Sequence, residues 1–414
     1  MPRATGPANV VRVGLAAFRW PLDPARATGR DETTLARALY ATPLQTDART
    51  GAVVPGLCTA WRASADFRHW TFTCKAAPSI AAALRRVKQL RDAPARWLFA
   101  DARISAPAAT TLSIRLPWAW RRFPYALTVV GAAPRFVPGP FELVSGNTHL
   151  VVIRREGLTV RFALVSPLAA VRQFRNGELD EAPIPLGDIV ATKADRRLGP
   201  EVRARTLLGL DVATIHGFTA ELRRIYWDTA NRGDYEQLVS ELAGSSAFGV
   251  VGGEQADPAA YRRALHAIPA LEQPAVRLDV PADPALRSGA RLLWAQWRDS
   301  GLGPRLVSGG NAQADGSLQR VIAAYPQEEA LPAQLVVEDA AAPRALLLRA
   351  LGAAEQRADL LGLDAQLRLR ASAIPIAWVV DARLVSPRLE GWREDALGNV
   401  DYAAVRSPAS SRRP

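Results

Sequence analysis

The stretch FRNGELDEAPI, residues 174–184, places an Asn-Gly pair and three acidic residues between two apolar segments. Residues 166–175 begin with Ser-Pro and carry apolar side chains at helical spacing, which predicts a helix. Gly177 is suited to end that helix, because glycine readily adopts the left-handed backbone of a helix C-terminus. The apolar run at 182–186 then predicts a strand. The stretch therefore marks a return of the chain from a helix to a sheet.

The segments on either side of this stretch indicate an α/β protein. The first 165 residues mix short strands with helical patterns, whereas the later part alternates strand and helix, which is typical of a parallel or mixed sheet covered by helices. We predict helices near residues 221–241, 285–303 and 344–359, and strands near 275–281, 304–309 and 374–384.

Length and composition limit the classes of protein that remain. A chain of 414 residues exceeds what one hydrophobic core usually fills, so we expect two or three domains. The formal net charge of +12 comes from 52 basic and 40 acidic residues. The arginines are scattered singly and in pairs, without the continuous basic stripe of a nucleic-acid groove, so we expect no nucleic-acid partner.

Two cysteines, Cys58 and Cys74, frame the segment CTAWRASADFRHWTFTC, which has the pattern of a β-hairpin with a polar tip at residues 64–66. Pairing about this tip would place the cysteines opposite each other, at a separation that a disulfide can bridge. A shift of one residue would separate them and leave two buried thiols. Both states stay open, and a disulfide would indicate an oxidising compartment.

Motifs for catalysis and for metal or phosphate binding are not evident. The four histidines, His69, His149, His216 and His266, are far apart and lack zinc-ligand spacing. The sequence has no GxxxxGK[ST] loop and no GxSxG elbow. We therefore expect a protein that is not an enzyme and that has no metal or other cofactor.

Five motifs in order resemble the extracytoplasmic solute-binding proteins of ABC importers, family 5, which includes oligopeptide- and dipeptide-binding proteins. The resemblance extends over nearly the whole chain, residues 10–405, and it suggests a shortened, divergent member. Its motifs are LYATPLQTDARTGAVVPGLCTAWRASADFRHWTFTCK at 39–75, GPFELVSG at 139–146, FRNGELD at 174–180, LRRIYWDTANRGDYEQLV at 222–239 and IPIAWVVDARLVSPRLEGWREDALGNVDYAAV at 374–405.

The resemblance implies a two-lobed α/β fold, similar to that of type II, cluster C periplasmic binding proteins, with mixed sheets covered by helices. The chain is expected to cross the hinge twice, near residues 211–218 and 374–378. Lobe one would then hold residues 1–212 and 379–414, with a β-rich subdomain at about 45–165. Lobe two would hold residues 213–378.

The resemblance also implies a function, the capture of a peptide-like or other small solute between the lobes and its delivery to an ABC transporter permease. In peptide binders of the family, a Tyr-Pro-Asp-Pro segment supplies an acid that pairs with the amino terminus of the ligand. This chain keeps Tyr325-Pro326 but has Gln327 in place of the acid, so neutral and anionic ligands stay open. The alternative is the same fold in a ligand-sensing or interaction role without transport.

Positions matching the family's cleft give the candidate ligand-binding residues. For Tyr40 and Trp227 the alternative is an aromatic side chain in the core, and for Arg30 it is a solvated loop charge. The candidates are Thr28, Gly29, Arg30, Glu32, Tyr40, His216, Trp227 and Tyr325.

The first residues, MPRATGPANVVRVGL, lack the pattern of a secretory signal. The protein is then either cytoplasmic, or numbered from near a mature N-terminus after removal of a signal. For the second case we expect a monomer in the periplasm or on the outer face of the cytoplasmic membrane. Contact with the membrane would pass through the permease or a lipid anchor.

Overall fold

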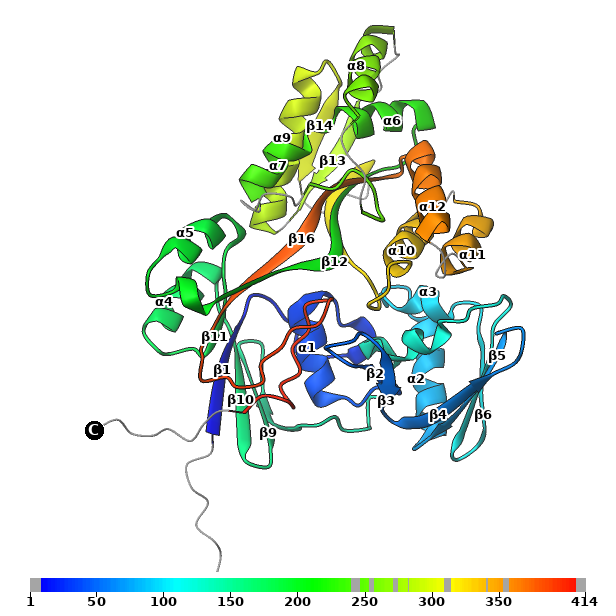
Figure 1. Cartoon of the computed structure of the whole chain (residues 1–414), viewed down its shortest axis with the longest axis vertical. Coiled ribbons are helices and arrows are strands. Elements are labelled where there is room, and N and C mark those ends of the chain that lie inside the picture. Colours follow the sequence, from blue (N-terminus) through cyan, green and yellow to red (C-terminus); the bar gives the residue numbers. More distant parts are fainter. Residues whose placement is uncertain are drawn as a thin grey trace, which may run out of the picture.

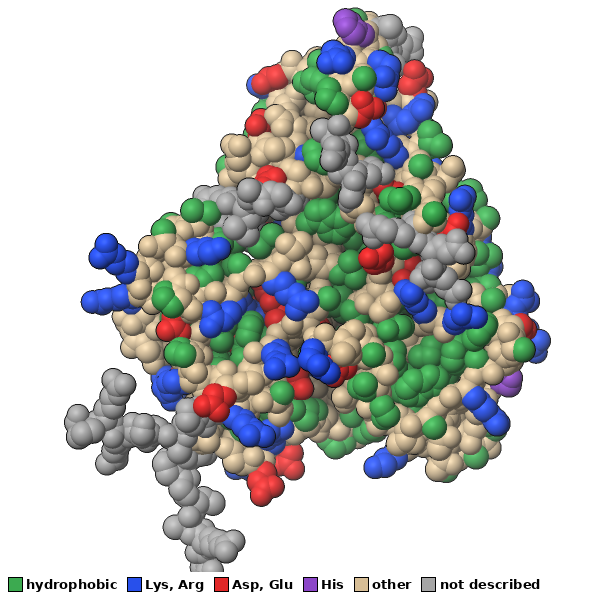
Figure 2. Space-filling model, viewed as in Figure 1, with side chains coloured by type: hydrophobic (Ala, Val, Ile, Leu, Met, Phe, Trp, Pro, Cys, Tyr) green, Lys and Arg blue, Asp and Glu red, His purple; other side chains and the backbone are tan. Residues whose placement is uncertain are grey.

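The fold was analysed in a computed structural model of the chain (Figure 1), which describes residues 9–239, 246–252, 257–270, 275–281, 283–308, 314–339, 342–352 and 357–406. The α/β class and the two-lobed fold with mixed, helix-covered sheets predicted from the sequence are confirmed. Within the described ranges, no helix is both long and apolar enough to cross a lipid bilayer. Figure 2 shows Lys and Arg side chains spread over the viewed face rather than gathered in one stripe.

A ten-stranded mixed sheet runs through the whole molecule, in the order β14-β13-β15-β12-β16-β11-β1-β10-β9-β8. Its strands have alternating or continuous apolar residues, as expected for a sheet covered on one or both faces. The strands are β1 (Asn9–Leu15), β8 (Glu142–Gly146), β9 (Leu150–Arg155), β10 (Leu158–Leu164), β11 (Glu181–Pro183), β12 (Val202–Ile215), β13 (Val276–Val280), β14 (Pro304–Ser308), β15 (Gly316–Ile322) and β16 (Ala373–Val385).

The two long strands β12 and β16 connect the lobes (Figure 1). They pair antiparallel over almost their full length, from Val202 opposite Leu384 to Thr214 opposite Ala373, with irregular register around residues 206–212. The lower end of β16 also pairs with β11, whereas the upper half of β12 also pairs with β15. The same two strands therefore belong to both halves of the sheet, which confirms that the chain crosses the hinge twice. The lobe limits at 212/213 and 378/379 fall inside these strands and stay predictions.

Two small sheets lie beside the large one, and the second carries the cysteine hairpin. They are β2 (Leu44–Thr46) with β3 (Val53–Pro55), and β4 (Cys58–Ala63), β5 (His69–Cys74), β7 (Thr111–Arg115) and β6 (Arg103–Ala108). Cys58 lies opposite Cys74 in the ladder, and the two are joined by a disulfide. The hairpin prediction and the disulfide alternative are thus confirmed.

Helices cover the sheets in three groups. Lobe one has α1 (Gly29–Leu39), α2 (Ala77–Gln89), α3 (Arg96–Phe99), α4 (Pro167–Arg175) and α5 (Ile189–Ala194). The upper part in Figure 1 has α6 (Ala220–Thr229), α7 (Arg232–Val239), α8 (Pro258–Ala267) and α9 (Pro284–Asp299), and the third group is α10 (Ala330–Glu338), α11 (Arg344–Gly352) and α12 (Arg357–Arg370). Short 3-10 helices span Pro24–Arg26, Phe123–Leu127, Val130–Ala132, Leu186–Asp188, Gly199–Glu201 and Ile268–Ala270.

The prediction of one continuous helix at 221–241 is wrong, because the segment forms two helices: α6 ends at Thr229 and α7 begins at Arg232. The Arg232 guanidinium is buried and donates to the carbonyls of Ala247 and Pro375, at 2.7 and 2.9 Å. Because this contact ties the start of α7 to β16, the chain turns there. The helix predicted at 344–359 ends at Gly352 as α11, and residues 353–356 lie outside the described residues.

The stretch 174–184 folds largely as predicted. Helix α4 ends at Arg175, and Gly177 has a φ of +72°, the left-handed conformation that glycine adopts at low cost. Strand β11 begins at Glu181, one residue before the predicted start, and is short, since a 3-10 helix follows at Leu186–Asp188.

The disulfide should contribute measurably to stability. Cys58 and Cys74 close a loop with a sequence separation of 16 residues. Loss of such a constraint on the unfolded chain costs about 3 kcal/mol. We expect the Cys58→Ser/Cys74→Ser double variant to show a free energy of unfolding lower by about that amount in urea titrations. Dithiothreitol should lower the stability of the wild type but not of the variant, and equal sensitivity of both proteins would contradict this role.

Candidate ligand-binding cavity

A cavity of about 970 Å³ lies between the lobes. Its walls come from α1 and the segments before it, from β15, α9 and α10, and from the hinge strand β16. This volume is at the upper end of that of small-molecule sites in proteins. The lining includes Ala17, Thr28, Gly29, Arg30, Glu32, Arg37, Ser288, Gln319, Arg320, Glu338, Val379, Asp381, Arg383 and Asn399.

The loop before α1 is held in place by Glu32. Its buried carboxylate accepts hydrogen bonds from the Thr28 backbone at 2.9 Å and from the Arg19 guanidinium at 2.8 Å. Burial alone would raise the pKa of Glu32, but these hydrogen bonds hold it below its usual value. Glu32 therefore fixes the first turn of α1, which orients the residues on either side of it toward the cavity.

Beneath the cavity, the fully buried carboxylate of Glu181 joins β11 to β16 and to the C-terminal segment. The Arg383 Nε of β16 lies 2.6 Å from Glu181 Oε1. The Trp392 indole and the Tyr402 hydroxyl each donate to Oε2 at 2.7 Å. A carboxylate buried without partners would be strongly unfavourable, so these contacts fix the C-terminal segment against the sheet.

Arg30 of α1 forms the cavity side of the same cluster. Its Nε lies 2.8 Å from Asp381 and 2.9 Å from Glu394. Arg30 also lies 3.7 Å from Glu181 and from Asp31, whose carboxylate is in turn 3.4 Å from Arg383.

The cluster holds four carboxylates, those of Asp31, Glu181, Asp381 and Glu394, but two guanidiniums. Burial raises the pKa of Glu394 to about 8, and neighbouring Asp381 acts in the same direction while Arg30 opposes it. Burial also raises the pKa of Asp31 and of Glu181. The folded protein therefore retains protons here at pH values where these acids are normally ionised.

On the opposite wall, Arg320 of β15 is fixed by Asp211 of the hinge strand β12. Its Nε and Nη2 donate to the two oxygens of Asp211 at 2.8 and 3.0 Å, and the Tyr235 hydroxyl donates to Asp211 at 3.0 Å. Asp211 is buried, so this network ties α7 and β15 to the hinge.

Four of the eight predicted ligand residues, Thr28, Gly29, Arg30 and Glu32, line the cavity. Their role in binding stays a prediction. Arg30 is mostly buried in ion pairs, and so is not the solvated loop charge that the sequence left as an alternative.

The other four lie elsewhere. Trp227 of α6 is 2% exposed and packs in the core, and Tyr325 is fully buried with its ring 5.9 Å from that of Tyr125. His216 is exposed beyond the end of β12, and its backbone N–H donates to the Asp315 carbonyl. Trp227 lies on α6, where an aromatic side chain at helical spacing fits a core as well as a cleft, and Tyr325 was placed at the cleft only by its match to the family's Tyr-Pro motif.

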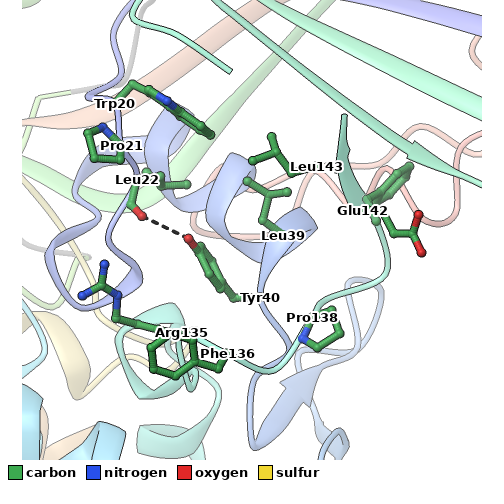
Figure 3. A pocket seen from close by; sticks show the side chains of 11 residues that line it. Trp20, Pro21, Leu22, Leu39, Tyr40, Arg135, Phe136, Pro138, Glu142 and Leu143 are labelled. Carbon is green, nitrogen blue, oxygen red and sulfur yellow. Dashed lines mark hydrogen bonds between the residues drawn. The ribbon is translucent and has the colours of Figure 1, made fainter. Parts of the chain in front are cut away.

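Tyr40 lines a separate surface pocket of about 480 Å³ (Figure 3). Its hydroxyl donates to the Leu22 carbonyl at 3.0 Å, and Trp20 and Phe136 form other parts of the wall. This pocket shares no lining residue with the large cavity.

The segment that replaces the family's acidic motif also turns away from the cavity. The Arg122 guanidinium donates to Gln327 at 2.7 Å and to Glu329 at 2.9 Å. Neither Gln327 nor Glu329 lines the cavity. The lining residues that sequence reasoning missed include Arg37, which lies seven residues after Arg30 on α1 and could have been inferred from helical spacing.

Comparison with known proteins gives one similar curated sequence. No family model matches the chain. The probable D,D-dipeptide-binding periplasmic protein DdpA of Escherichia coli (strain K12) is 28% identical over 292 residues, which cover 58% of this chain and 56% of that protein. The match thus spans little more than half of the relative's length.

Solved structures match over nearly the whole chain. The murein tripeptide binding protein MppA of Escherichia coli has a TM-score of 0.79 at 16% identity and covers 95% of this chain and 96% of its own. OppA of Haemophilus influenzae, in complex with RPPGFSPFR, has a TM-score of 0.79 at 14% identity, with 97% and 99% covered. The pheromone receptor PrgZ has a TM-score of 0.80 at 15% identity, with 97% and 100% covered. The resemblance to family 5 solute-binding proteins is confirmed.

Replacement of Arg383 should destabilise the fold strongly. Arg383→Met leaves the carboxylate of Glu181 without its nearest cation, and removing one partner of a buried ion pair costs about 3–5 kcal/mol. The measurement is the free energy of unfolding in urea. Arg388→Met is the control, because Arg388 is half-exposed and its ion pair with Asp180 should contribute no more than about 1 kcal/mol. Similar losses in the two variants would contradict the proposed importance of the buried pair.

The protonated cluster should make stability depend on pH. A glutamate in the unfolded chain loses its proton near pH 4.3, whereas Glu394 in the folded protein keeps it to about pH 8. The folded state binds more protons within this window, so stability falls as pH rises from about 4 to about 8.

Glutamine has no carboxyl group to titrate. The Glu394→Gln variant should therefore show a smaller fall in urea midpoint between pH 5.5 and pH 8.5 than the wild type. A smaller slope remains in both proteins, because Asp31 and Glu181 act with the same sign. Glu156→Gln, in the exposed turn after β9, serves as a control that should keep the wild-type slope. A wild-type slope in Glu394→Gln would exclude Glu394 as its source.

Proposed function

We propose that this chain is a solute-binding protein that captures a small ligand, peptide-like or another small solute, between its lobes and delivers it to an ABC transporter permease. The observation that carries the proposal is the cavity of about 970 Å³ whose walls come from both sides of a hinge made of β12 and β16. The match to a dipeptide-binding relative and to peptide-binding structures supports the same role.

Capture follows from contacts that the ligand makes with both walls at once. Such contacts form fully when the lobes are closed, so the ligand shifts the population toward the closed state. Closure also excludes water, which strengthens each polar contact. The ion pairs that hold Arg30 and Arg383 keep the cavity floor fixed while the walls move about the hinge.

We infer a binding role without catalysis. Asp31, Asp381 and Glu32, which line the cavity, are each engaged by an arginine. Carboxylates held in this way position the backbone and are poorly placed to exchange protons with a ligand. The known relatives are binding proteins, which supports this inference.

We infer a location in the periplasm or on the outer face of the cytoplasmic membrane. The Cys58–Cys74 disulfide supports an oxidising compartment, and the curated relative is named as periplasmic. The protein would act as a monomer and meet the membrane through the permease or a lipid anchor.

A thermal-shift screen against short peptides, amino acids, sugars and anionic metabolites tests the proposal. A ligand at 100 times its Kd should stabilise the folded state by about 2.7 kcal/mol. Ser288→Trp, which places a large side chain in the cavity wall, should abolish the shift, because Ser288 lines the cavity from α9. Asp299→Trp is the matched control, since Asp299 is exposed at the end of the same helix. The absence of any stabilising solute, or equal shifts in both variants, would contradict capture in this cavity.

A further inference from the structure

Most charged side chains that line the cavity are already engaged within the protein. Arg30, Asp381 and Arg383 belong to the cluster of ion pairs around Glu181, where Asp31 also accepts backbone hydrogen bonds. Glu32 is paired with Arg19, and Arg320 is paired with Asp211. Asp283 accepts a backbone hydrogen bond as the N-cap of α9. In the described lining, Arg37, Asp283 and Glu338 have no ion pair, and because Asp283 is engaged in capping α9, Arg37 and Glu338 are the two side chains of opposite sign that remain. A charge without a counter-ion in a cavity is available to a ligand.

Arg37 follows Arg30 by seven residues, which is two helical turns, so both side chains project from the same side of α1. Its Nε is buried and has no hydrogen-bond partner, and its Nη2 makes one long contact, 3.4 Å, with the Thr128 carbonyl. A guanidinium carries five donors in a fork that matches a carboxylate. Most of the donor capacity of Arg37 is therefore free for an anionic group in the cavity.

Glu338 is the last residue of α10. Its carboxylate accepts hydrogen bonds from the amides of Gln319 at 3.1 Å and Gln334 at 3.4 Å, and no cation of the described chain lies within ion-pair distance. Glu338 stays exposed to the open cavity, and desolvation by the surrounding walls raises its pKa, while the two amides oppose this shift. A cationic ligand group would supply the counter-charge that the protein does not.

Arg37 and Glu338 both line one cavity, and the contacts of each are with other residues of the described chain. They come from different walls, the α1 wall and the α10 wall. A ligand that carries both signs of charge can satisfy both residues at once, whereas a ligand with one sign leaves the other residue unpaired.

We propose that Arg37 and Glu338 determine the charge selectivity of the cavity, which takes a small dipolar ligand with its anionic group on Arg37 and its cationic group on Glu338. This inference rests on the proposed function. It assigns the two ends of the ligand to named walls, with the cation at α10 rather than at the segment around Gln327, whose side chain is engaged by Arg122.

Isothermal titration calorimetry with trialanine and its three capped forms tests the proposal. The capped forms are N-acetyl-trialanine, which lacks the cation, trialanine amide, which lacks the carboxylate, and the doubly capped peptide. We expect the wild type to bind free trialanine at least about tenfold more tightly than either singly capped form, since each hydrogen bond to a charged group contributes about 1.5–3 kcal/mol.

Two variants then assign each end of the peptide. Arg37→Gln should bind free trialanine and its amide equally, while it still discriminates against the acetylated form. Glu338→Gln should lose discrimination against the acetylated form and keep that against the amide. Arg203→Gln and Glu156→Gln, both exposed and outside the cavity lining, are charge-matched controls that should keep the full wild-type pattern.

Three results would overturn the inference while leaving solute capture intact. The first is equal binding of all four peptides by the wild type. The second is an equal loss for all four peptides in Arg37→Gln or Glu338→Gln, which would show an effect on folding or closure. The third is tight binding of an uncharged or singly charged solute in the thermal-shift screen with no binding of trialanine. Silence of the wild type in both experiments would instead refute the proposed function itself.

Discussion

The buried carboxylate of Glu181 is the interaction on which the arrangement of lobe one depends. A buried charge needs compensating partners, and here Trp392 and Tyr402 donate hydrogen bonds to one oxygen of Glu181 while Arg383 forms an ion pair with the other. Together they hold the end of β16 and the C-terminal segment against β11. Since Arg30 of α1 contacts the same cluster, the cavity floor is fixed by charge pairing as well as by packing.

The stretch 174–184 shows how far local sequence determines this arrangement. The helix end at Gly177 and the turn into a strand follow from residue preferences, and both could be predicted. The partners of its acids could not, because they lie far away in the sequence. Asp180 binds Arg12 of β1, 168 residues earlier, and Glu181 binds Arg383. Pairing over such distances depends on the sheet order, which residue spacing does not encode.

The candidate site was predictable to a similar extent. Thr28, Gly29, Arg30 and Glu32 line the cavity as expected, but as the N-cap and first turn of α1 rather than as a loop before it. The aromatic candidates Trp227 and Tyr325 were not, because an aromatic side chain suits a buried core as well as a ligand cleft, and both are buried in the core. Glu338 carried no local signal at all. Its availability depends on which neighbours lack a positive charge, and this is a property of the folded cavity.

The contact between Arg122 and Glu329 has an energetic consequence. It joins the 3-10 helix region near Phe123 to the start of α10, away from β12 and β16, and the stacked rings of Tyr125 and Tyr325 lie beside it. Any widening of the gap that separates these two segments has to expose a carboxylate and two aromatic rings to solvent. Separation of the protein at this point therefore carries a desolvation cost that the paired strands β12 and β16 alone do not impose.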